Sequence, residues 1–459
     1  MPRKHEWKTF TLWRKTYGDI VYLNILGRPL IILNTFETAT DLMEKRSSKY
    51  SDRPRFPLVD LVGHDFNFGF MHYNKRWHAC RRVFASQFGK ASLPGYYRSH
   101  QAAVSTLLNN LLEDPDHFVD HLRLHAGQLI MDVTYGIPIK TREDPLIKTA
   151  EAVMSTISIA VSPVMWVYNP IPLLQSLPSW LGGKNFMSQV WKWQSDVQDL
   201  QNVPFEMAKA SMSALGGRSF FIANLLQGMD DNASAEQETL IRDCAAVSYG
   251  GGSDTTTAIS SIFILAMLRH PDIQKAAQSE IDRVVGSHRL PNFSDRARLP
   301  YVTAVMMEVL RWHPSSPQGI PHTLAEDDEY KGYRIPAGSV VIGSIWGILH
   351  DPEIYPDPVK FEPERYIVSG ELDCSRNDPT RIAFGFGRRI CPGKHFSEDT
   401  LWLLMARILA TFNIEPVDAD ITIPVDFTSG AISHPTPFSC VIRPRSEASE
   451  DLIRNSEIA

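Results

Sequence analysis

The sequence predicts a mainly α-helical protein with small β-sheets, an α+β fold. Long helical patterns cover residues 74–88, 240–268 and 396–410, whereas strand-like runs are short and bounded by turn residues. No low-complexity run, internal repeat or Pro/Gly/Ser-rich joint divides the 459 residues. We therefore expect one large domain over residues 1–459.

The elements of the first half follow from periodicity and turn residues. Residues 19–34 alternate apolar and polar side chains around Gly27-Arg28, which predicts a β-hairpin. The elements expected after it are a short helix over 37–45, a loop over 53–72, a basic helix over 74–88, and helices within 150–215 that break at Pro170, Pro172 and Pro178.

The second half begins with the longest helical pattern, 240–268, which is interrupted by Gly250-Gly251-Gly252. The elements expected after it are a helix over 302–313 that Pro314 ends, short strands within 322–345 with turns at Lys331-Gly332 and Pro336-Ala337-Gly338, a helix over 396–410, and a last hairpin over 427–443.

Composition narrows the classes of function. The formal net charge of −6 argues against a nucleic-acid partner. The five cysteines are odd in number and irregularly spaced, which argues against a disulfide framework and favours a reducing compartment. Residues 1–15 are polar and basic, and no run approaches the roughly 20 apolar residues of a membrane span.

The most informative run is Phe384-Gly385-Phe386-Gly387-Arg388-Arg389-Ile390-Cys391-Pro392-Gly393. A thiolate needs positive surroundings and N–H donors, and the helix expected after Cys391 provides both at its start. Gly387 and Gly393 would let the backbone approach a large flat cofactor, Phe384 would cover the sulfur, and Arg389 would pair with a cofactor carboxylate. A thiolate in such a loop is suited to be the axial ligand of heme iron.

Two other interpretations of the cysteine are weighed. Cys391 could be a buried free thiol, or it could form half of a zinc site with His395. The zinc site would need a second pair of ligands, and the sequence offers no such cysteine or histidine doublet.

Residues 251–256, Gly-Gly-Ser-Asp-Thr-Thr, carry two open interpretations. Three consecutive glycines within a helix each cost about 1 kcal/mol relative to alanine, so they need a reason. One reason is a local opening that admits a small molecule, with Asp254 and Thr255 as a proton relay. The other is a helix break at which Asp254 becomes a new N-cap.

Two pairs share a helix face by their spacing. Glu308 and Arg311 lie three apart among apolar neighbours, which suggests a buried pair, although an exposed pair would add only about 0–1 kcal/mol. Trp77 and Arg81 lie four apart in the basic helix, where the alternative is a simple packed face.

These motifs together resemble the cytochrome P450 monooxygenases. The cysteine run fits Phe-x-x-Gly-x-Arg-x-Cys-x-Gly at every fixed position, and residues 251–256 match the family's Ala/Gly-Gly-x-Asp/Glu-Thr-Thr/Ser. The resemblance implies a fold that holds heme b between the long central helix and the helix after Cys391, with Cys391 as the axial iron ligand. It favours the dioxygen interpretation of Asp254 and Thr255.

The resemblance also gives roles to the remaining candidates. Glu308 and Arg311 match the family's Glu-x-x-Arg, which Arg365 completes as a buried structural clamp. Trp77 and Arg81 match a Trp-x-x-x-Arg that contacts one heme propionate, and His322 matches a position that serves the other.

The resemblance implies a heme-thiolate monooxygenase that uses O2 and electrons from an NADPH-cytochrome reductase flavoprotein. A basic cluster would dock that partner: Lys75, Arg76, Arg82, Lys90, Arg388 and Lys394. Substrate contacts are expected from residues 55–71, 165–186, 249–254, 316–320 and 428–432, which are mostly apolar and suit a lipophilic small molecule. Residues 44–54, 326–341 and 433–447 resemble mushroom-type fungal members of secondary metabolism.

Two alternative functions on this fold are an isomerase or dehydratase that consumes no external electrons, and a non-catalytic heme-thiolate sensor. Eukaryotic family members usually carry an amino-terminal membrane anchor, and this chain starts where such a segment would end. We therefore expect peripheral association with the cytoplasmic face of the endoplasmic reticulum, or a soluble form.

Overall fold

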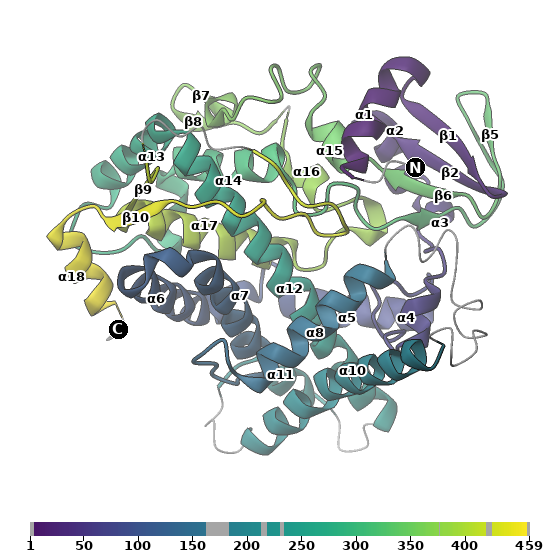
Figure 1. Cartoon of the computed structure of the whole chain (residues 1–459), viewed down its shortest axis with the longest axis horizontal. Helices are drawn as coiled ribbons and strands as arrows, with labels where there is room; N and C mark the ends of the chain where they lie inside the picture. Colours follow the sequence, from purple (N-terminus) through teal and green to yellow (C-terminus); the bar gives the residue numbers. More distant parts are fainter. Residues whose placement is uncertain are drawn as a thin grey trace.

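A four-stranded β-sheet lies at one side of a molecule built mostly of helices (Figure 1). This computed structural model describes residues 4–161, 183–212, 218–229, 234–375, 377–418 and 425–456. The sheet has the order β1-β2-β6-β3, and three two-stranded sheets pair β9 with β10, β4 with β5, and β7 with β8. The strands are β1 (Ile20–Ile25), β2 (Arg28–Leu33), β3 (His322–Thr323), β4 (Asp328–Tyr330), β5 (Tyr333–Ile335), β6 (Val340–Gly343), β7 (Ile367–Val368), β8 (Glu371–Leu372), β9 (Phe412–Glu415) and β10 (Val441–Pro444).

The helices surround one central helix, α12 (Ala235–Arg269), which crosses the middle of the molecule (Figure 1). The other α-helices are α1 (Glu6–Tyr17), α2 (Phe36–Ala39), α3 (Ser47–Tyr50), α4 (Pro57–Leu61), α5 (Lys75–Phe88), α6 (Tyr97–Glu113), α7 (Phe118–Tyr135), α8 (Pro145–Ala160), α10 (Gly183–Ser211), α11 (Phe221–Gln227), α13 (Pro271–Val284), α14 (Pro300–Trp312), α15 (Ile345–Leu349), α16 (Thr380–Ala383), α17 (Lys394–Thr411) and α18 (Glu447–Asn455). The expected fold class is therefore confirmed.

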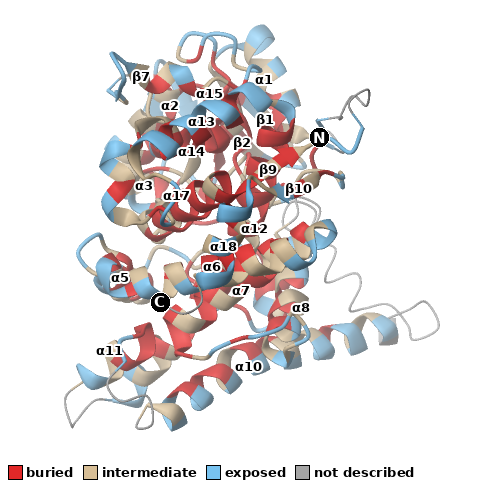
Figure 2. Ribbon diagram, turned by 90° about the vertical axis from the view of Figure 1, so that its left-hand side faces the viewer, coloured by how far each residue is buried: buried red, intermediate tan, exposed pale blue. Residues whose placement is uncertain are grey.

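Helix α12 links two apolar cores. Its first half packs through Cys244 and Tyr249 into a core shared with α5, α7, α8 and α11. Its second half, from Ile259 to Leu268, packs into the largest core, with α14 and α17. Buried residues accordingly follow α12, α14 and α17 through the interior (Figure 2). Residues 250–257 lie between these two cores, in the segment where the sequence places its proton relay.

The expected interruption of this helix at the three glycines is wrong, because α12 runs unbroken through them. The reason is packing against two neighbouring helices. A Cβ on Gly252 would lie 3.0 Å from Ile130 Cδ1 of α7, and a Cβ on Gly250 would lie 3.0 Å from Met154 Sδ of α8. Two of the three glycines thus allow close approach of neighbouring helices, and that packing offsets their low helix propensity.

The first hairpin forms as expected. Strands β1 and β2 pair antiparallel from Ile20 opposite Leu33 to Ile25 opposite Arg28. The turn consists of Leu26 and Gly27, with φ angles of 52° and 83°. Two positive φ values match the twist of a two-residue hairpin turn. This hairpin then pairs with β6 in parallel, which brings residues 340–343 beside the amino-terminal segment.

Other elements differ from the expectations. The predicted loop 53–72 contains the short helix α4. Residues 427–443 form no local hairpin of paired strands: β10 pairs with β9, and an isolated bridge joins Phe427 to Pro435. Pro170, Pro172 and Pro178, the expected helix breaks, lie outside the described residues. In the part of the chain that is described, no helix has the length and apolar character needed to cross a bilayer.

Candidate heme-thiolate site

Cys391 lies in a turn just before α17. Its backbone N–H donates to the carbonyl of Phe384 at 2.8 Å, which closes the loop between the two ends of the motif. Helix α17 begins at Lys394, three residues later, so the thiol lies at the positive end of an 18-residue helix. Helix α17 contacts the central helix α12.

The glycines of this loop have separate functions. Gly387 has φ of 55°, and a Cβ there would lie 2.0 Å from the carbonyl oxygen of Met43, so only glycine fits. Gly387 thus closely approaches the backbone of the π-helical turn Thr40–Lys45. Gly385, with φ of 80°, makes the second left-handed turn. Gly393 has ordinary angles, and a Cβ there would lie 4.0 Å from Cys391 Sγ.

The Cys391 thiol combines an accessible surface with crowded surroundings. The residue is exposed, yet burial among protein atoms raises the pKa of the thiol. A side chain can be accessible to solvent and still be surrounded by protein atoms when it faces an internal space, and Cys391 does so. The Gly393 N–H and the charges of Arg81 and Lys394 oppose the rise and favour the thiolate. A thiolate stabilised in this way is a soft ligand that can bind iron.

Three arginines gather near this loop without a carboxylate partner. Arg53 and Arg389 are buried, and Arg81 is half-buried. Burial lowers the pKa of each guanidinium, to about 10 for Arg389, and mutual repulsion with Arg81 adds to the shift at Arg389. Among the described residues none of the three is in an ion pair. Asp52 is the nearby acid, and it accepts from the backbone N–H groups of Arg53 and Tyr73.

Backbone carbonyls hold these arginines in place. Arg389 donates to the carbonyls of Ser51, Phe68 and Met71 at 2.7–3.1 Å. Arg53 donates to those of Gly69, Ile320 and Pro321 at 2.6–3.0 Å. Arg81 donates to the carbonyl of Ile390, next to the cysteine, at 2.7 Å. Excess positive charge fixed beside a thiol fits the carboxylates of a heme group.

Trp77 and His322 border the same arginines. The guanidinium of Arg389 lies 4.6 Å from the Trp77 ring centre, and that of Arg81 lies 5.8 Å from it. His322 is buried, and its Nδ1–H donates to the carbonyl of Tyr50 at 2.7 Å. Burial, followed by the charge of Arg53, lowers the pKa of His322 well below its usual value. The structure thus brings Trp77, Arg81, His322 and Arg389 together.

Arg53 belongs to this group and was missed in the sequence analysis. It stands at the start of the predicted loop 53–72, just ahead of residues 55–71, which are expected to contact substrate. An arginine in a loop of glycines, prolines and aromatics gave no spacing signal, and its burial depends on residues 320–321, far away in the chain.

On α12 the candidate relay residues face different directions. Thr255 Oγ1 donates to the carbonyl of Gly251 at 2.8 Å, and a Cβ on Gly251 would meet no atom within 4 Å. Asp254 Oδ1 lies 3.1 Å from Nε2 of His434. Because the helix continues through this segment, Asp254 is not an N-cap, which excludes the structural alternative. Thr255 and Gly251 thus border open space, while Asp254 faces the carboxy-terminal loop.

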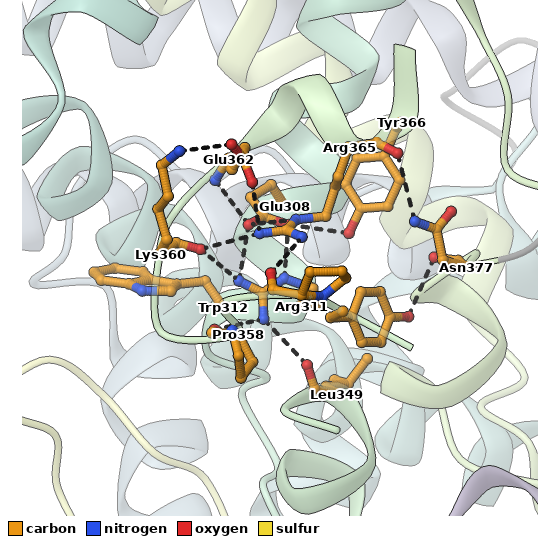
Figure 3. Close-up of polar contacts among 12 residues, drawn as sticks. Glu308, Arg311, Trp312, Leu349, Pro358, Lys360, Glu362, Arg365, Tyr366 and Asn377 are labelled. Carbon is orange, nitrogen blue, oxygen red and sulfur yellow. Dashed lines mark hydrogen bonds and ion pairs between the residues drawn. The ribbon is translucent and has the colours of Figure 1, made fainter. Parts of the chain in front are cut away.

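Glu308 and Arg311 are fully buried, and Arg365, whose side chain is 5% exposed, completes their cluster (Figure 3). Arg311 donates to both carboxylate oxygens of Glu308, at 2.7 and 2.8 Å, and Arg365 donates to Glu308 at 3.2 Å. Tyr366 donates its hydroxyl to Glu308 at 3.0 Å, and Arg311 also reaches the carbonyls of Leu349, Pro358 and Lys360. Burial lowers the pKa of Arg311, but the hydrogen bonds and negative charge of Glu308 have the larger combined effect, so the pKa of Arg311 is raised above its usual value.

The expected basic cluster is only partly a surface. Lys75, Arg82, Lys90 and Arg388 are exposed. Arg76 instead pairs with the buried Asp243 of α12, which offsets its charge although 37% of its side chain is exposed. Lys394 is half-buried and donates to the carbonyl of Thr380 at 2.9 Å. The corrected cluster therefore consists of the four exposed residues.

Of the segments expected to contact substrate, residues 165–182 lie outside the described parts of the chain. The zinc alternative finds no support: His395 Nδ1 lies 3.0 Å from Glu398, and no group of three or more potential ligands could hold a metal within the described residues. A thiol flanked by fixed arginines, at the start of a helix that packs against the long central helix, is the arrangement expected of a heme-thiolate protein.

Comparisons with known proteins agree with that class. The cytochrome P450 family model matches residues 2–442. A cytochrome P450 monooxygenase of Armillaria gallica is 40% identical over 455 residues, covering 97% of this chain and 89% of the relative. Tryptamine 4-monooxygenase of Psilocybe cyanescens is 38% identical over 457 residues, covering 97% and 90%.

A solved structure supports the fold alone. It is a zebra fish cytochrome P450 with abiraterone, at 21% identity and a TM-score of 0.77, covering 96% of this chain and 100% of the other. The chain belongs to the cytochrome P450 family and is a heme-dependent monooxygenase.

Proposed function

We propose that this monooxygenase inserts one oxygen atom from O2 into a lipophilic small molecule, with electrons that an NADPH-cytochrome reductase supplies. The observation that carries the proposal is Cys391, an accessible thiol with helix-start N–H groups and arginines around it. Heme held by a thiolate supplies the O–O cleavage chemistry.

The residues of the chain divide the remaining work. Arg53, Arg81, Arg389 and His322 bind and orient the heme carboxylates. Thr255 holds its hydroxyl beside open space, and Asp254 supplies the proton that the reaction needs. Glu308, Arg311 and Arg365 fix residues 358–366 against α14 and have no direct part in the chemistry.

The four exposed cations support a docking face for the reductase. Lys75, Arg82 and Lys90 lie on or directly after α5, and Arg388 lies in the cysteine loop, so a single acidic partner could contact both elements. Complementary charge would raise the rate of encounter and make electron delivery sensitive to salt.

The substrate is proposed by class only. The relatives are fungal, and one is named for the 4-monooxygenation of tryptamine. Together with the mostly apolar segments expected to contact substrate, this supports a lipophilic or aromatic compound of fungal secondary metabolism. A screen of such compounds for shifts of the heme absorption band would identify candidates.

We also propose peripheral, salt-sensitive association with the cytoplasmic face of the endoplasmic reticulum. Lys4 and Lys8 are exposed and would each add about 1 kcal/mol near anionic lipid. Fractionation followed by a high-salt wash tests this: release into the wash supports the proposal, and full retention in the pellet without aggregation contradicts it.

The central test replaces Cys391 with serine. Cys391→Ser should abolish the carbon monoxide difference band that thiolate ligation gives to reduced heme, because an alcohol does not replace the thiolate. Cys374→Ser is the matched control, since Cys374 is half-buried and its thiol donates to Met307 Sδ at 3.5 Å. An unchanged band in the Cys391 variant would overturn the assignment.

A further inference from the structure

The lysine three residues after Cys391 is fixed against the cysteine loop. Lys394 was expected on the docking surface, but only 16% of its side chain is exposed. Its backbone N–H donates to the carbonyl of Cys391 at 3.3 Å, and its Nζ donates to the carbonyl of Thr380 on α16 at 2.9 Å. Nζ also lies 5.8 Å from the ring centre of Phe384, whose carbonyl accepts from the Cys391 N–H. The ammonium group is therefore held beside the loop that carries the thiol.

A glutamate one turn further along α17 opposes this charge. Lys394 Nζ lies 3.9 Å from Glu398 Oε1, and the Glu398 side chain is also 16% exposed. Glu398 Oε2 lies 3.0 Å from Nδ1 of His395, which holds the carboxylate in place. A separation of 3.9 Å is too long for a hydrogen bond. Glu398 thus reduces the field of Lys394 without being bonded to it.

Both charges act on the thiol. Burial has the largest effect on the pKa of the Cys391 thiol and raises it, whereas the charge of Lys394 lowers this pKa and that of Glu398 raises it. A fixed charge in surroundings of low dielectric acts more strongly than the same charge in water. Charge and burial around an axial ligand are also among the factors that set the reduction potential of a heme.

Lys394 differs in this respect from the exposed cations of the docking surface. Charges in solvent are screened over about 8 Å at physiological ionic strength, whereas partly buried charges are screened much less. Lys75 and Lys90 are exposed, so their effect on the heme should disappear in salt. A lysine that is covered and bonded to α16 keeps its effect. The remaining alternative is that Lys394 only joins α17 to α16.

We propose that Lys394 and Glu398 set the reduction potential of the heme bound at Cys391, with Lys394 raising the potential and Glu398 lowering it. The inference rests on the proposed role of Cys391 as the iron ligand. Both are positioning residues that act through the thiolate. Reduction adds one electron, which the proposed flavoprotein loses, and breaks no bond in the protein. A fixed positive charge favours the state with the extra electron, so Lys394 makes this transfer easier.

The first test removes the positive charge. Lys394→Met keeps most of the side-chain length, and a spectroelectrochemical titration of the substrate-free, heme-loaded protein gives the midpoint potential. At the midpoint potential of the unchanged protein, the ratio of reduced to oxidised heme should fall roughly ten-fold, which is a shift of about 59 mV for one electron. The difference should persist at high salt because the charge is mostly covered.

The second test reverses the sign and restores the charge. Glu398→Gln should raise the midpoint potential, and Lys394→Arg should recover most of the value that Lys394→Met loses. A residue that only joins α17 to α16 would lower the free energy of unfolding and leave the potential unchanged. The carbon monoxide band should remain in every variant, because Cys391 is unaltered.

Lys209→Met is the matched control. Lys209 also pairs with a glutamate, Glu238 at 2.5 Å, and its Nζ lies 5.7 Å from the ring centre of Phe205. It belongs to α10, which lies at the bottom of Figure 2, whereas α17 lies in the upper half. Its replacement should leave the midpoint potential unchanged.

The outcomes separate the two levels of the argument. If the unchanged protein lacks the carbon monoxide band, or if Cys391→Ser keeps it, the proposed function fails and the inference falls with it. If the band is present but Lys394→Met and Glu398→Gln have the potential of Lys209→Met, or shift it in the same direction, only the role of the charge pair is overturned. If Lys394→Met does not retain heme, Glu398→Gln decides, and an unchanged potential in that variant overturns the inference.

Discussion

Arginine side chains are buried in two parts of this molecule. In one part a buried carboxylate neutralises the arginine, and in the other the arginines lie beside carbonyl groups. Arg311 is completely buried and meets both oxygens of Glu308, which is also completely buried. Arg53 and Arg389 are almost as buried, yet they meet backbone carbonyls, and within the described residues no carboxylate pairs with them. The pKa of Arg311 is raised, whereas those of Arg53 and Arg389 are lowered.

The difference separates a structural cluster from a binding site. A buried charge is tolerated when a counter-charge and hydrogen bonds satisfy it, which Glu308 does for Arg311. The cluster near Cys391 has cations in excess, so an anionic ligand would satisfy it. A buried arginine without a carboxylate partner does not by itself indicate a binding site. Arg407 is also buried, and it donates to the carbonyls of Pro291 and Gln101. Three cations gathered beside the accessible thiol distinguish the binding site.

The largest expected effect comes from breaking the balanced pair. Glu308→Gln keeps the shape of the side chain but leaves Arg311 charged and unpaired, which should lower the free energy of unfolding by about 3–5 kcal/mol. Glu326→Gln is the control, because Glu326 is exposed and pairs with Lys49 at 3.1 Å, so its replacement should cost at most about 1 kcal/mol. Thermal or urea unfolding of the heme-loaded proteins measures both, and equal losses would show that the buried pair has no special weight.

The next effect concerns the unbalanced site and should fall mainly on heme retention. Arg389→Met removes a buried cation and its hydrogen bonds to the carbonyls of Ser51, Phe68 and Met71, so the heme-free protein should lose some stability as well. The loss of a charged hydrogen bond of about 1.5–3 kcal/mol should speed heme transfer to apomyoglobin by about 10- to 150-fold.

Arg407→Met provides the contrast. Burial lowers the pKa of Arg407 to about 10 as well, but it lies on α17 and donates to residues 101 and 291. Its replacement should reduce stability and leave the rate of heme transfer unchanged. Equal transfer rates in the Arg389 and Arg407 variants would contradict the idea that the cluster holds the heme carboxylates.

These two regions were not equally predictable from the sequence. Glu308 and Arg311 lie three apart on one helix among apolar neighbours, so spacing alone suggested a buried pair. The cysteine loop was predictable because its residues are consecutive. Arg53 was missed because its burial comes from residues 320–321, and His434 because a lone loop histidine carries no pattern.

The glycine run shows a second limit of the sequence. Glycine propensity predicted an interruption at residues 250–252, but contacts with Ile130 and Met154 determine the outcome, and these depend on where α7 and α8 cross α12. In the same way, β10 pairs with β9 because the chain returns there after residues 427–435 and forms no local hairpin. Tertiary contacts of this kind have no local signature.

The smallest effect concerns the neutral member of the unbalanced site. Burial, then the charges of Arg53 and Arg389, keep the pKa of His322 well below its usual value, so without an anion it is neutral near pH 7. A bound carboxylate would raise that pKa. Binding would then take up a proton, and heme affinity should fall as the pH rises from the lowered pKa of free His322 through its higher pKa in the heme-bound protein. His322→Gln should weaken heme retention less than Arg389→Met does and should flatten this pH dependence. Heme transfer to apomyoglobin across that range measures it, and an equally steep profile in the glutamine variant would show that His322 does not titrate with heme binding.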